Sequence, residues 1–311
     1  MSNPLPSPDA RHLVARLRFR HLRLLVELDR GGSLRAAATA LSLTQPGLSK
    51  ALAEVESAFG FSLFTRNSRG LTPTPQGVVA IRGAVFLLEE LAHVSAEAST
   101  QPPVTVLRIG APPFVAQGYL PAVLTRLTHG EQRVRVQLME ERVPLLVQSL
   151  LQGRLDALVS SYPAPTPDTS GAALRYERLF DADFTVIAPA GHALARARKV
   201  SWQRLAQERW IMPANSSMVR RMLEETFRRA GVMAPAPVIE STSPVTNVRL
   251  VAEGLGVSAV PAAVLASAGS GGGVKAVKVD PPIPANPVAL IYRAEVESPR
   301  LQVLRAALNL S

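Results

Sequence analysis

The chain of 311 residues contains no cysteine, and this absence excludes several classes of protein. Disulfide scaffolds, thiolate metal sites, cysteine nucleophiles and thiol redox sensors all require sulfhydryl groups. Histidine is scarce and scattered as well. The five histidines show neither HExxH nor HxH spacing, so we expect no metal site and no cofactor. These histidines are His12, His21, His93, His129 and His192.

Long apolar runs are missing too. The longest candidate, residues 143–151, is interrupted by Pro144 and Gln148 and is about half as long as the ~18 residues that a membrane span needs. The first 20 residues carry three prolines and several arginines but no apolar stretch like that of a secretory signal. We therefore expect a cytoplasmic protein with no membrane partner. The length and the apolar fraction of 47% indicate a globular chain of two domains, with room for a small third.

Negative charge is scarce relative to positive charge. The formal net charge is +10, and it is distributed unevenly. Residues 1–82 hold 11 basic and 5 acidic side chains, whereas residues 83–311 hold 23 and 19. A positive field favours polyanionic partners, and its concentration in the N-terminal quarter predicts a nucleic-acid site there.

Two short helices joined by a turn are predicted after an amphipathic helix at residues 21–28. Ser33 is placed to cap the first, residues 34–41. Thr44 is placed to cap the second, and Pro46 lies in its first turn, where a missing N–H costs nothing. The buried stripe of this second helix repeats at intervals of 4, 3 and 4 residues: Leu48, Leu52, Val55 and Phe59.

The opposite face of the second helix is polar at its start. Gln45, Ser49 and Lys50 lie there, and such a unit can place its second helix in the major groove. Gln45 can bond bidentately to adenine, while Ser49 and Lys50 suit phosphate oxygens or a further base edge. The alternatives are a solvent-exposed helix start for Gln45 and a solvated cation for Lys50.

The spacing of these residues resembles the winged helix-turn-helix of the LysR-type transcriptional regulators. That family shows GS…AA..L..[ST]QP..S…E…G..LF.R, and the match covers about 35 positions without a gap. Gly47 stands where alanine is usual, Leu34 where phenylalanine is usual, and Pro73 where leucine is usual. The matching residues are Gly32, Ser33, Ala37, Ala38, Leu41, Thr44, Gln45, Pro46, Ser49, Leu52, Glu56, Gly60, Leu63, Phe64 and Arg66.

Residues 61–74 would form the wing. Arginines at its tip, Arg66 and Arg69, can reach a phosphate or a narrow minor groove. Arg66 has an equal alternative, which is a pair with a helix carboxylate such as Glu56. The residues that the resemblance assigns to DNA binding are Ser33, Thr44, Gln45, Pro46, Ser49, Lys50, Arg66 and Arg69.

A long connecting helix is predicted from Thr74 as cap and Pro75 as first residue. Its apolar residues follow a spacing close to a heptad seam. The resemblance implies an antiparallel helix pair that joins two chains, and the alternative is that the stripe packs only within its own chain. The residues expected at the seam are Val78, Ile81, Val85, Leu88 and Leu91.

From residue 104 onward, short apolar strands alternate with helices, which predicts parallel sheets with helical crossovers. The region resembles the effector domain of the same family. The expected fold class is thus α plus α/β, with a winged helix-turn-helix, a long linker helix and a two-lobed, periplasmic-binding-protein-like effector domain. The expected boundaries are a tail at 1–17, the DNA-binding domain at 18–75, the linker at 76–100, and the effector domain at 101–311, with lobes at 104–165 plus 268–311 and at 166–267.

In such folds a small ligand lies between the lobes, where loops after strands and helix N-termini offer N–H groups to anions. Several loops of this sequence fit that description, although helix capping needs the same residue types. The effector is expected to be a small, anionic metabolite of unknown identity. The residues expected to contact it are Ala111, Pro112, Phe114, Ser160, Ser161, Asn215, Ser216, Ser217, Thr242 and Ser243.

The resemblance implies a ligand-responsive regulator that binds an inverted-repeat site in double-stranded promoter DNA as a homodimer or homotetramer, with RNA polymerase as a further candidate partner. An enzyme is the first alternative, but the sequence has no GxSxG, Walker or GxGxxG motif, and Asp156 and Glu253 lie at expected helix ends. A solute-binding transport protein is the second alternative. It would need export and would carry no DNA-binding module.

Overall fold

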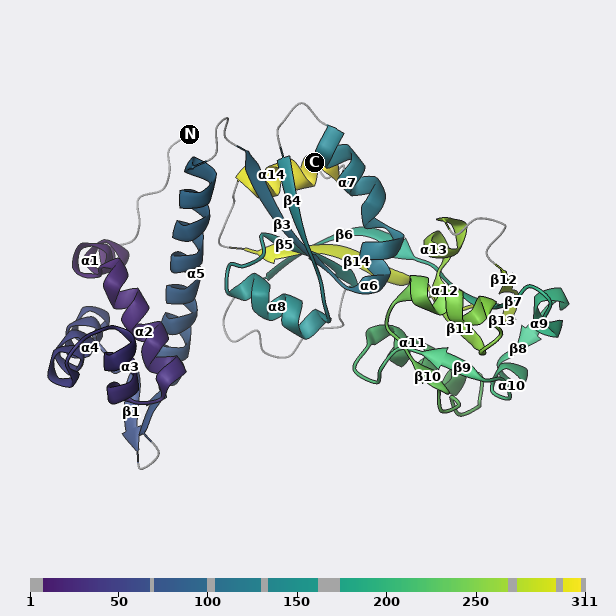
Figure 1. The fold of residues 1–311 in the computed structure, drawn as a ribbon, viewed down its shortest axis with the longest axis horizontal. Coiled ribbons are helices and arrows are strands. Elements are labelled where there is room, and N and C mark those ends of the chain that lie inside the picture. The colour runs from purple at the N-terminus through teal and green to yellow at the C-terminus, as the bar shows by residue number, and fades with distance from the viewer. Residues whose placement is uncertain are drawn as a thin grey trace. The chain divides into compact units, whose positions relative to one another are not determined.

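The computed structural model describes residues 8–67, 70–99, 104–129, 134–161, 174–267, 273–294 and 299–308 (Figure 1). The chain divides into two compact units, and each is described by itself. The first contains every element up to α5 together with residues 148–155, and the second contains every strand from β3 onward. Among the described residues, no helix is both long enough and apolar enough to span a bilayer.

The first unit is a helical bundle with a β-hairpin, and its helix ends follow from cap chemistry. Ser33 Oγ accepts a hydrogen bond from the N–H of Ala36 at 3.2 Å, and Thr44 Oγ1 accepts one from Gly47 at 3.3 Å. Both predicted caps are confirmed. The elements are α1 (Pro8–Arg16), α2 (Phe19–Gly31), α3 (Leu34–Ala40), α4 (Gln45–Phe59), β1 (Phe64–Asn67), β2 (Gly70–Pro73) and α5 (Pro75–Ala98).

Helix α1 was not expected, because the sequence analysis treated residues 1–17 as a tail. The helix packs against α4, and an Nη atom of Arg16 contacts Ser57 Oγ at 3.3 Å. Nine residues are too few for an apolar periodicity to be read, since short helices depend on tertiary contacts rather than on propensity. Helix α1 was therefore missed because its stability depends on its contact with α4, which the sequence does not show.

A leucine-rich core joins α2, α4, the hairpin and α5. Leu28, Leu48 and Leu63 are fully buried in it. The hairpin is also fastened by its backbone, because the N–H of Leu71 donates to the carbonyl of Gly32 at 2.8 Å. The wing predicted at 61–74 is therefore present as the β1–β2 hairpin, held against the turn that precedes α3.

The first lobe of the second unit is a five-stranded sheet with the order β4-β3-β5-β14-β6. Strand β3 runs parallel to β4 and β5, while β14 runs antiparallel to β5 and β6. Its strands are β3 (Thr105–Ala111), β4 (Val134–Glu140), β5 (Ala157–Ser161), β6 (Leu174–Ala182) and β14 (Asn286–Arg293). Its helices are α6 (Pro113–Gly118), α7 (Leu120–His129), α14 (Pro299–Ala307) and the first residues of α8 (Val143–Leu151), which is divided between the two units at residue 148.

The second lobe is a sheet with the order β10-β9-β11-β7-β12, accompanied by the parallel pair β8 and β13. The T-shaped contacts of Phe227 with Trp202 and Trp210 fill its core. The strands are β7 (Phe184–Pro189), β8 (Val200–Ser201), β9 (Trp210–Met212), β10 (Ile239–Glu240), β11 (Val257–Pro261), β12 (Val274–Val277) and β13 (Val279–Asp280). The helices are α9 (Ala193–Arg196), α10 (Trp202–Leu205), α11 (Met218–Arg229), α12 (Pro244–Ala252) and α13 (Ala262–Ser267).

Strand pairing corrects two expectations about this unit. The sheets are mixed rather than parallel, because β14 in one sheet and β7 in the other run antiparallel to both of their neighbours. The lobe boundaries also move. Strand β6 pairs in the first sheet, although residues 166–267 were assigned to the second lobe, and β12 pairs in the second sheet, although residues 268–311 were assigned to the first. Alternation along a strand reports which face is buried but not which sheet it joins.

Candidate functional site

The start of α4 is built as a presented polar surface. Thr44, Gln45, Pro46 and Lys50 are exposed and Ser49 is half-buried. The opposite side of the helix carries the buried stripe of Leu48, Leu52 and Val55, which holds it against the core. The structure thus places Gln45, Ser49 and Lys50 within the first two turns of α4.

Two hydroxyl groups near this surface are still able to donate a hydrogen bond. Ser33 and Thr44 use oxygen lone pairs to cap α3 and α4, so that each O–H remains able to donate to a phosphate oxygen. Arg69, also predicted to bind DNA, lies outside the described residues.

The wing is tied to α4 by two side chains. Arg66 in β1 donates from Nη2 to Ser49 Oγ at 3.4 Å, which brings an exposed guanidinium beside the first turns of α4. Glu56 does not form the alternative pair with Arg66. Its Oε1 accepts hydrogen bonds from the N–H groups of Leu63 at 2.7 Å and Phe64 at 3.2 Å. The Glu56 carboxylate thus positions the start of the hairpin by accepting hydrogen bonds from two backbone N–H groups. Sequence reasoning missed this role.

The five residues predicted for dimerisation do not share one environment. Ile81 is only 7% exposed and belongs to the core of its own chain, and Leu88 packs against that core. Val85 is half-buried, whereas Val78 and Leu91 are exposed. The heptad-like spacing therefore combines residues that cover the DNA-binding module with residues that face outward.

A further set of apolar side chains on α5 is exposed. Val79, Leu87 and Leu91 are 44–50% exposed, and Val94 is 51% exposed. Gly83 lies between Val79 and Leu87 at the same four-residue spacing, and a Cβ built there meets no heavy atom within 4 Å. We call Val79, Gly83, Leu87, Leu91 and Val94 the outer face of α5.

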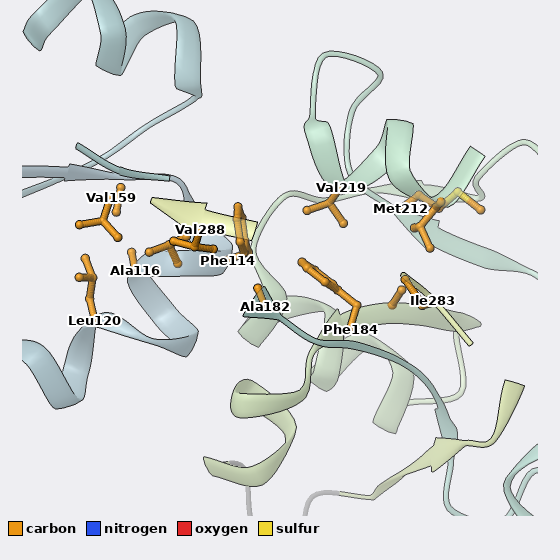
Figure 2. Close-up of a cluster of buried hydrophobic side chains, with 14 of the residues drawn as sticks. Phe114, Ala116, Leu120, Val159, Ala182, Phe184, Met212, Val219, Ile283 and Val288 are labelled. Atoms are coloured by element: carbon orange, nitrogen blue, oxygen red, sulfur yellow. The ribbon is translucent and has the colours of Figure 1, made fainter. Parts of the chain in front are cut away.

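The predicted effector residues after β3 are largely enclosed. Ala111 is fully buried, Pro112 is buried as the N-cap of α6, and Phe114 is 5% exposed. The ring of Phe114 packs on Phe184 of the second lobe with centroids 5.6 Å apart. Figure 2 shows this pair at the middle of an apolar cluster that continues to Met212. Phe114 thus takes part in an apolar contact between the lobes.

The two serines that end β5 are buried as well. Ser161 Oγ accepts a hydrogen bond from Nδ2 of Asn286 at 2.6 Å. Ser160 is fully buried, and its Oγ has no hydrogen-bond partner in the part of the chain that the structure describes. Neither hydroxyl faces solvent.

The polar loops of the second lobe are accessible. Asn215, Ser216 and Thr242 are exposed, while Ser217 and Ser243 are half-buried N-caps of α11 and α12. The side chain of Ser243 accepts a capping bond, whereas that of Ser217 makes none. These loops precede the N-termini of α11 and α12, where the helix dipole favours anions.

A separate cavity of about 440 Å³ borders β6 and the start of β14. An ion pair between Arg178 and Asp181, with an N–O distance of 2.6 Å, forms part of its wall. None of the predicted effector residues lines this cavity. Its lining residues are Tyr176, Arg178, Asp181, Ala285 and Pro287.

Asp156, which the sequence places at an expected helix end, forms a buried ion pair. Its Oδ2 accepts from the backbone N–H of Arg108 at 2.8 Å, and its Oδ1 lies 2.5 Å from Nη2 of the same arginine. Arg300 approaches Oδ1 at 3.5 Å. A carboxylate enclosed by two guanidinium groups joins β3 to α14 and is not available as a general acid or base.

Two family models match the chain. Residues 19–78 match the bacterial regulatory helix-turn-helix protein, lysR family, and residues 100–310 match the LysR substrate binding domain. The regulator GbpR of Azospirillum brasilense is 31% identical over 247 residues, which are 78% of this chain and 70% of GbpR. The protein named "Probable hydrogen peroxide-inducible genes activator" of Mycobacterium leprae is 32% identical over 242 residues, which are 77% of this chain and 76% of that protein.

Solved structures share the fold. A variant of full-length OxyR from Pseudomonas aeruginosa matches with a TM-score of 0.65 and 24% identity, covering 94% of this chain and 95% of that one. Full-length BenM matches with a TM-score of 0.56 and 23% identity, covering 94% of this chain and 96% of that one. The expected fold class is confirmed.

A DNA-binding module and a substrate-binding module on one chain define a ligand-responsive regulator. The chain belongs to the LysR family of bacterial transcriptional regulators. The predicted function is confirmed at this level, and the family and the relatives above are regulators rather than enzymes.

Proposed function

We propose that the protein recognises an inverted-repeat site in double-stranded promoter DNA through the first turn of α4. The observation that carries this proposal is the exposure of Gln45 and Lys50 opposite a fully buried apolar stripe. Arg66, held beside Ser49, adds a cation from the wing. Base contacts by Gln45 supply sequence discrimination, and the cations supply phosphate binding.

Two or four copies assemble on this site, and the outer face of α5 joins a pair of them. This pairing through α5 is supported by a row of exposed valines and leucines around Gly83. Because Gly83 has no side chain, a second helix can come close there. An apolar strip of this kind is buried when helices pair. A dimer with two recognition helices matches a two-fold DNA site.

A small anionic metabolite binds between the lobes near the N-termini of α11 and α12 and alters DNA binding. The exposed polar side chains of Asn215, Ser216 and Thr242 support this site. Because the chain has no cysteine, thiol oxidation is not its signal, although one relative is named for a response to hydrogen peroxide. A ligand changes the activity only by binding two arrangements of the protein unequally.

The test is fluorescence anisotropy of the full chain with DNA from the intergenic region beside its own gene and with random DNA. Gln45→Ala should reduce the discrimination between the two by about 1–3 kcal/mol. Lys50→Ala should weaken binding to both and lower the salt slope by about 0.9. The matched control is Gln207→Ala, an exposed glutamine of the second unit. Unchanged discrimination in Gln45→Ala would reject the recognition role of α4.

The effector site is tested in the same assay with a panel of small carboxylates. We expect at least one of them to change the affinity for the intergenic DNA. The double variant Ser216→Ala/Thr242→Ala should abolish that change and leave the DNA affinity without carboxylate intact. A response that persists in the double variant would place the effector elsewhere.

A further inference from the structure

The N-terminus of α12 lacks one hydrogen-bond acceptor of its own. The first N–H groups of a helix have no partner within the helix. Ser243 Oγ accepts from the N–H of Thr246 at 3.3 Å, and Pro244 has no N–H. The N–H of Val245 is left, and nothing in the sequence next to α12 accepts it.

Gln117, in α6 of the other lobe, supplies that acceptor. Its Oε1 accepts from the N–H of Val245 at 3.2 Å and from the hydroxyl of Ser243 at 3.4 Å. Its Nε2 donates to Oε1 of Glu140, the last residue of β4, at 2.8 Å. A carboxylate only accepts and a helix N–H only donates, so that these partners fix which end of the carboxamide faces which lobe.

We propose that Gln117 is a latch that holds the two lobes of the effector domain together. The bond to Glu140 lies within the first lobe and orients the side chain, whereas the bonds to Val245 and Ser243 cross to the second lobe. Separation of α6 from α12 breaks the second set and keeps the first. Opening of the lobes therefore strips the Val245 N–H of its acceptor, and closing restores it.

Two other contacts between the lobes lie on the same short helix or next to it. A Cβ at Gly118 would lie 3.4 Å from Pro261 Cβ and from Val264 Cγ2, so α6 meets the second lobe at close range. Tyr119 donates its hydroxyl to the carbonyl of Asp183 at 3.4 Å, next to the crossover between β6 and β7. The Gly118 contact is apolar and tolerates sliding, and Tyr119 makes one long hydrogen bond, whereas Gln117 makes three bonds of fixed direction that reach both lobes. Gln117 is thus the positioning residue of this contact, and the latch does not depend on which effector binds.

The chain's lack of cysteine makes the test direct. Ala122→Cys on α7 and Lys275→Cys on β12 place one spin label on each lobe at exposed positions, without background labelling. Labelled full-length chain, diluted in excess unlabelled chain, reports the distance between the lobes of a single copy by pulsed electron resonance. Residue-resolved hydrogen exchange is measured at the Val245 amide in the same protein.

Gln117→Leu removes every polar contact of the latch, whereas Gln117→Glu/Glu140→Gln keeps all three with donor and acceptor exchanged at Glu140. We expect Gln117→Leu to raise the ratio of longer to shorter label separations, and the exchange rate of Val245, by about thirtyfold, the factor expected for two ordinary hydrogen bonds. The double variant should restore both readings. Gln137→Leu, an exposed glutamine of β4, is the control and should change neither.

Any one of three results would overturn the proposal. An unchanged Val245 exchange rate in Gln117→Leu would show that the bond is not made in solution. A faster exchange with an unchanged distance distribution, or a double variant that behaves like Gln117→Leu, would show that the bond does not hold the lobes. Because neither reading involves DNA or effector, failure of the latch is distinct from failure of the proposed function.

Discussion

Removal of the Glu56 carboxylate should detach the base of the wing from α4. Glu56→Ala leaves the N–H groups of Leu63 and Phe64 without their acceptor, at a place where both side chains are buried and water enters poorly. A hydrogen bond to a charged group contributes about 1.5–3 kcal/mol, and the 3.2 Å bond to Phe64 is the weaker of the two. We expect a loss of about 3 kcal/mol in the local stability of the hairpin, which is about a hundredfold in its opening.

Hydrogen exchange on the full chain measures this loss at the two amides themselves. Glu56→Gln is the matched variant, because it keeps an oxygen acceptor and loses only the charge, so we expect about a tenfold effect. A detached wing also loses the hydrogen bond from Arg66 to Ser49, so that the Arg66 guanidinium no longer lies beside α4. Affinity for specific and random DNA should then fall together in Glu56→Ala. Wild-type exchange at Leu63 and Phe64 in that variant would refute the argument.

The remaining predictions concern α5 and the start of α2. Gly77→Ala should lower the melting temperature by the equivalent of about 3 kcal/mol, because its Cβ would overlap the carbonyl oxygen of Leu63. Gly83→Ala, in open space on the same helix, should stabilise the helix by about 1 kcal/mol and yet weaken self-association in sedimentation; unchanged self-association would argue against the outer face as the joint. Burial, followed by the charge of Arg20, lowers the pKa of His21, whose Nδ1 accepts from the N–H of Arg18 at 3.3 Å. The folded state thus binds fewer protons than the unfolded state below about pH 6.5, and stability should fall from pH 7 to pH 5 in wild type but less in His21→Gln; equal pH slopes would contradict this account.

Signals that act within a few residues were readable from the sequence. Ser33 and Thr44 cap the helices that they were predicted to cap, and the buried stripe of α4 is the one that the spacing indicated. At the end of that stripe the structure differs, because Ala58 is buried where Phe59 was expected and Phe59 is half-buried. Cap chemistry and helical periodicity involve neighbours three or four residues away, so that little tertiary knowledge is needed. The exposed polar turn of α4 followed from the same reasoning.

Signals that depend on distant partners were misread. The seam predicted on α5 included both Ile81, which is buried in the core of its own chain, and Leu91, which is exposed. A heptad pattern does not indicate whether a helix packs within its own chain or against a second chain. Strands β6 and β12 were placed in the wrong lobes for a similar reason, since each joins its sheet at an edge. The serines at the end of β5 resembled a binding loop but are buried within the sheet.

The interlobe contact of Gln117 shows the physical limit most clearly. Ser243 and Pro244 read as a self-sufficient helix start, and only a count of the N–H groups reveals that Val245 needs an acceptor. That acceptor stands 128 residues earlier in the chain, on a helix of six residues that no periodicity predicts. A single glutamine can meet this need because its carboxamide both accepts and donates, so that one side chain joins Glu140 of one lobe to α12 of the other. Such a residue has no sequence signature, because its role is defined by two partners that become neighbours only when both lobes have folded.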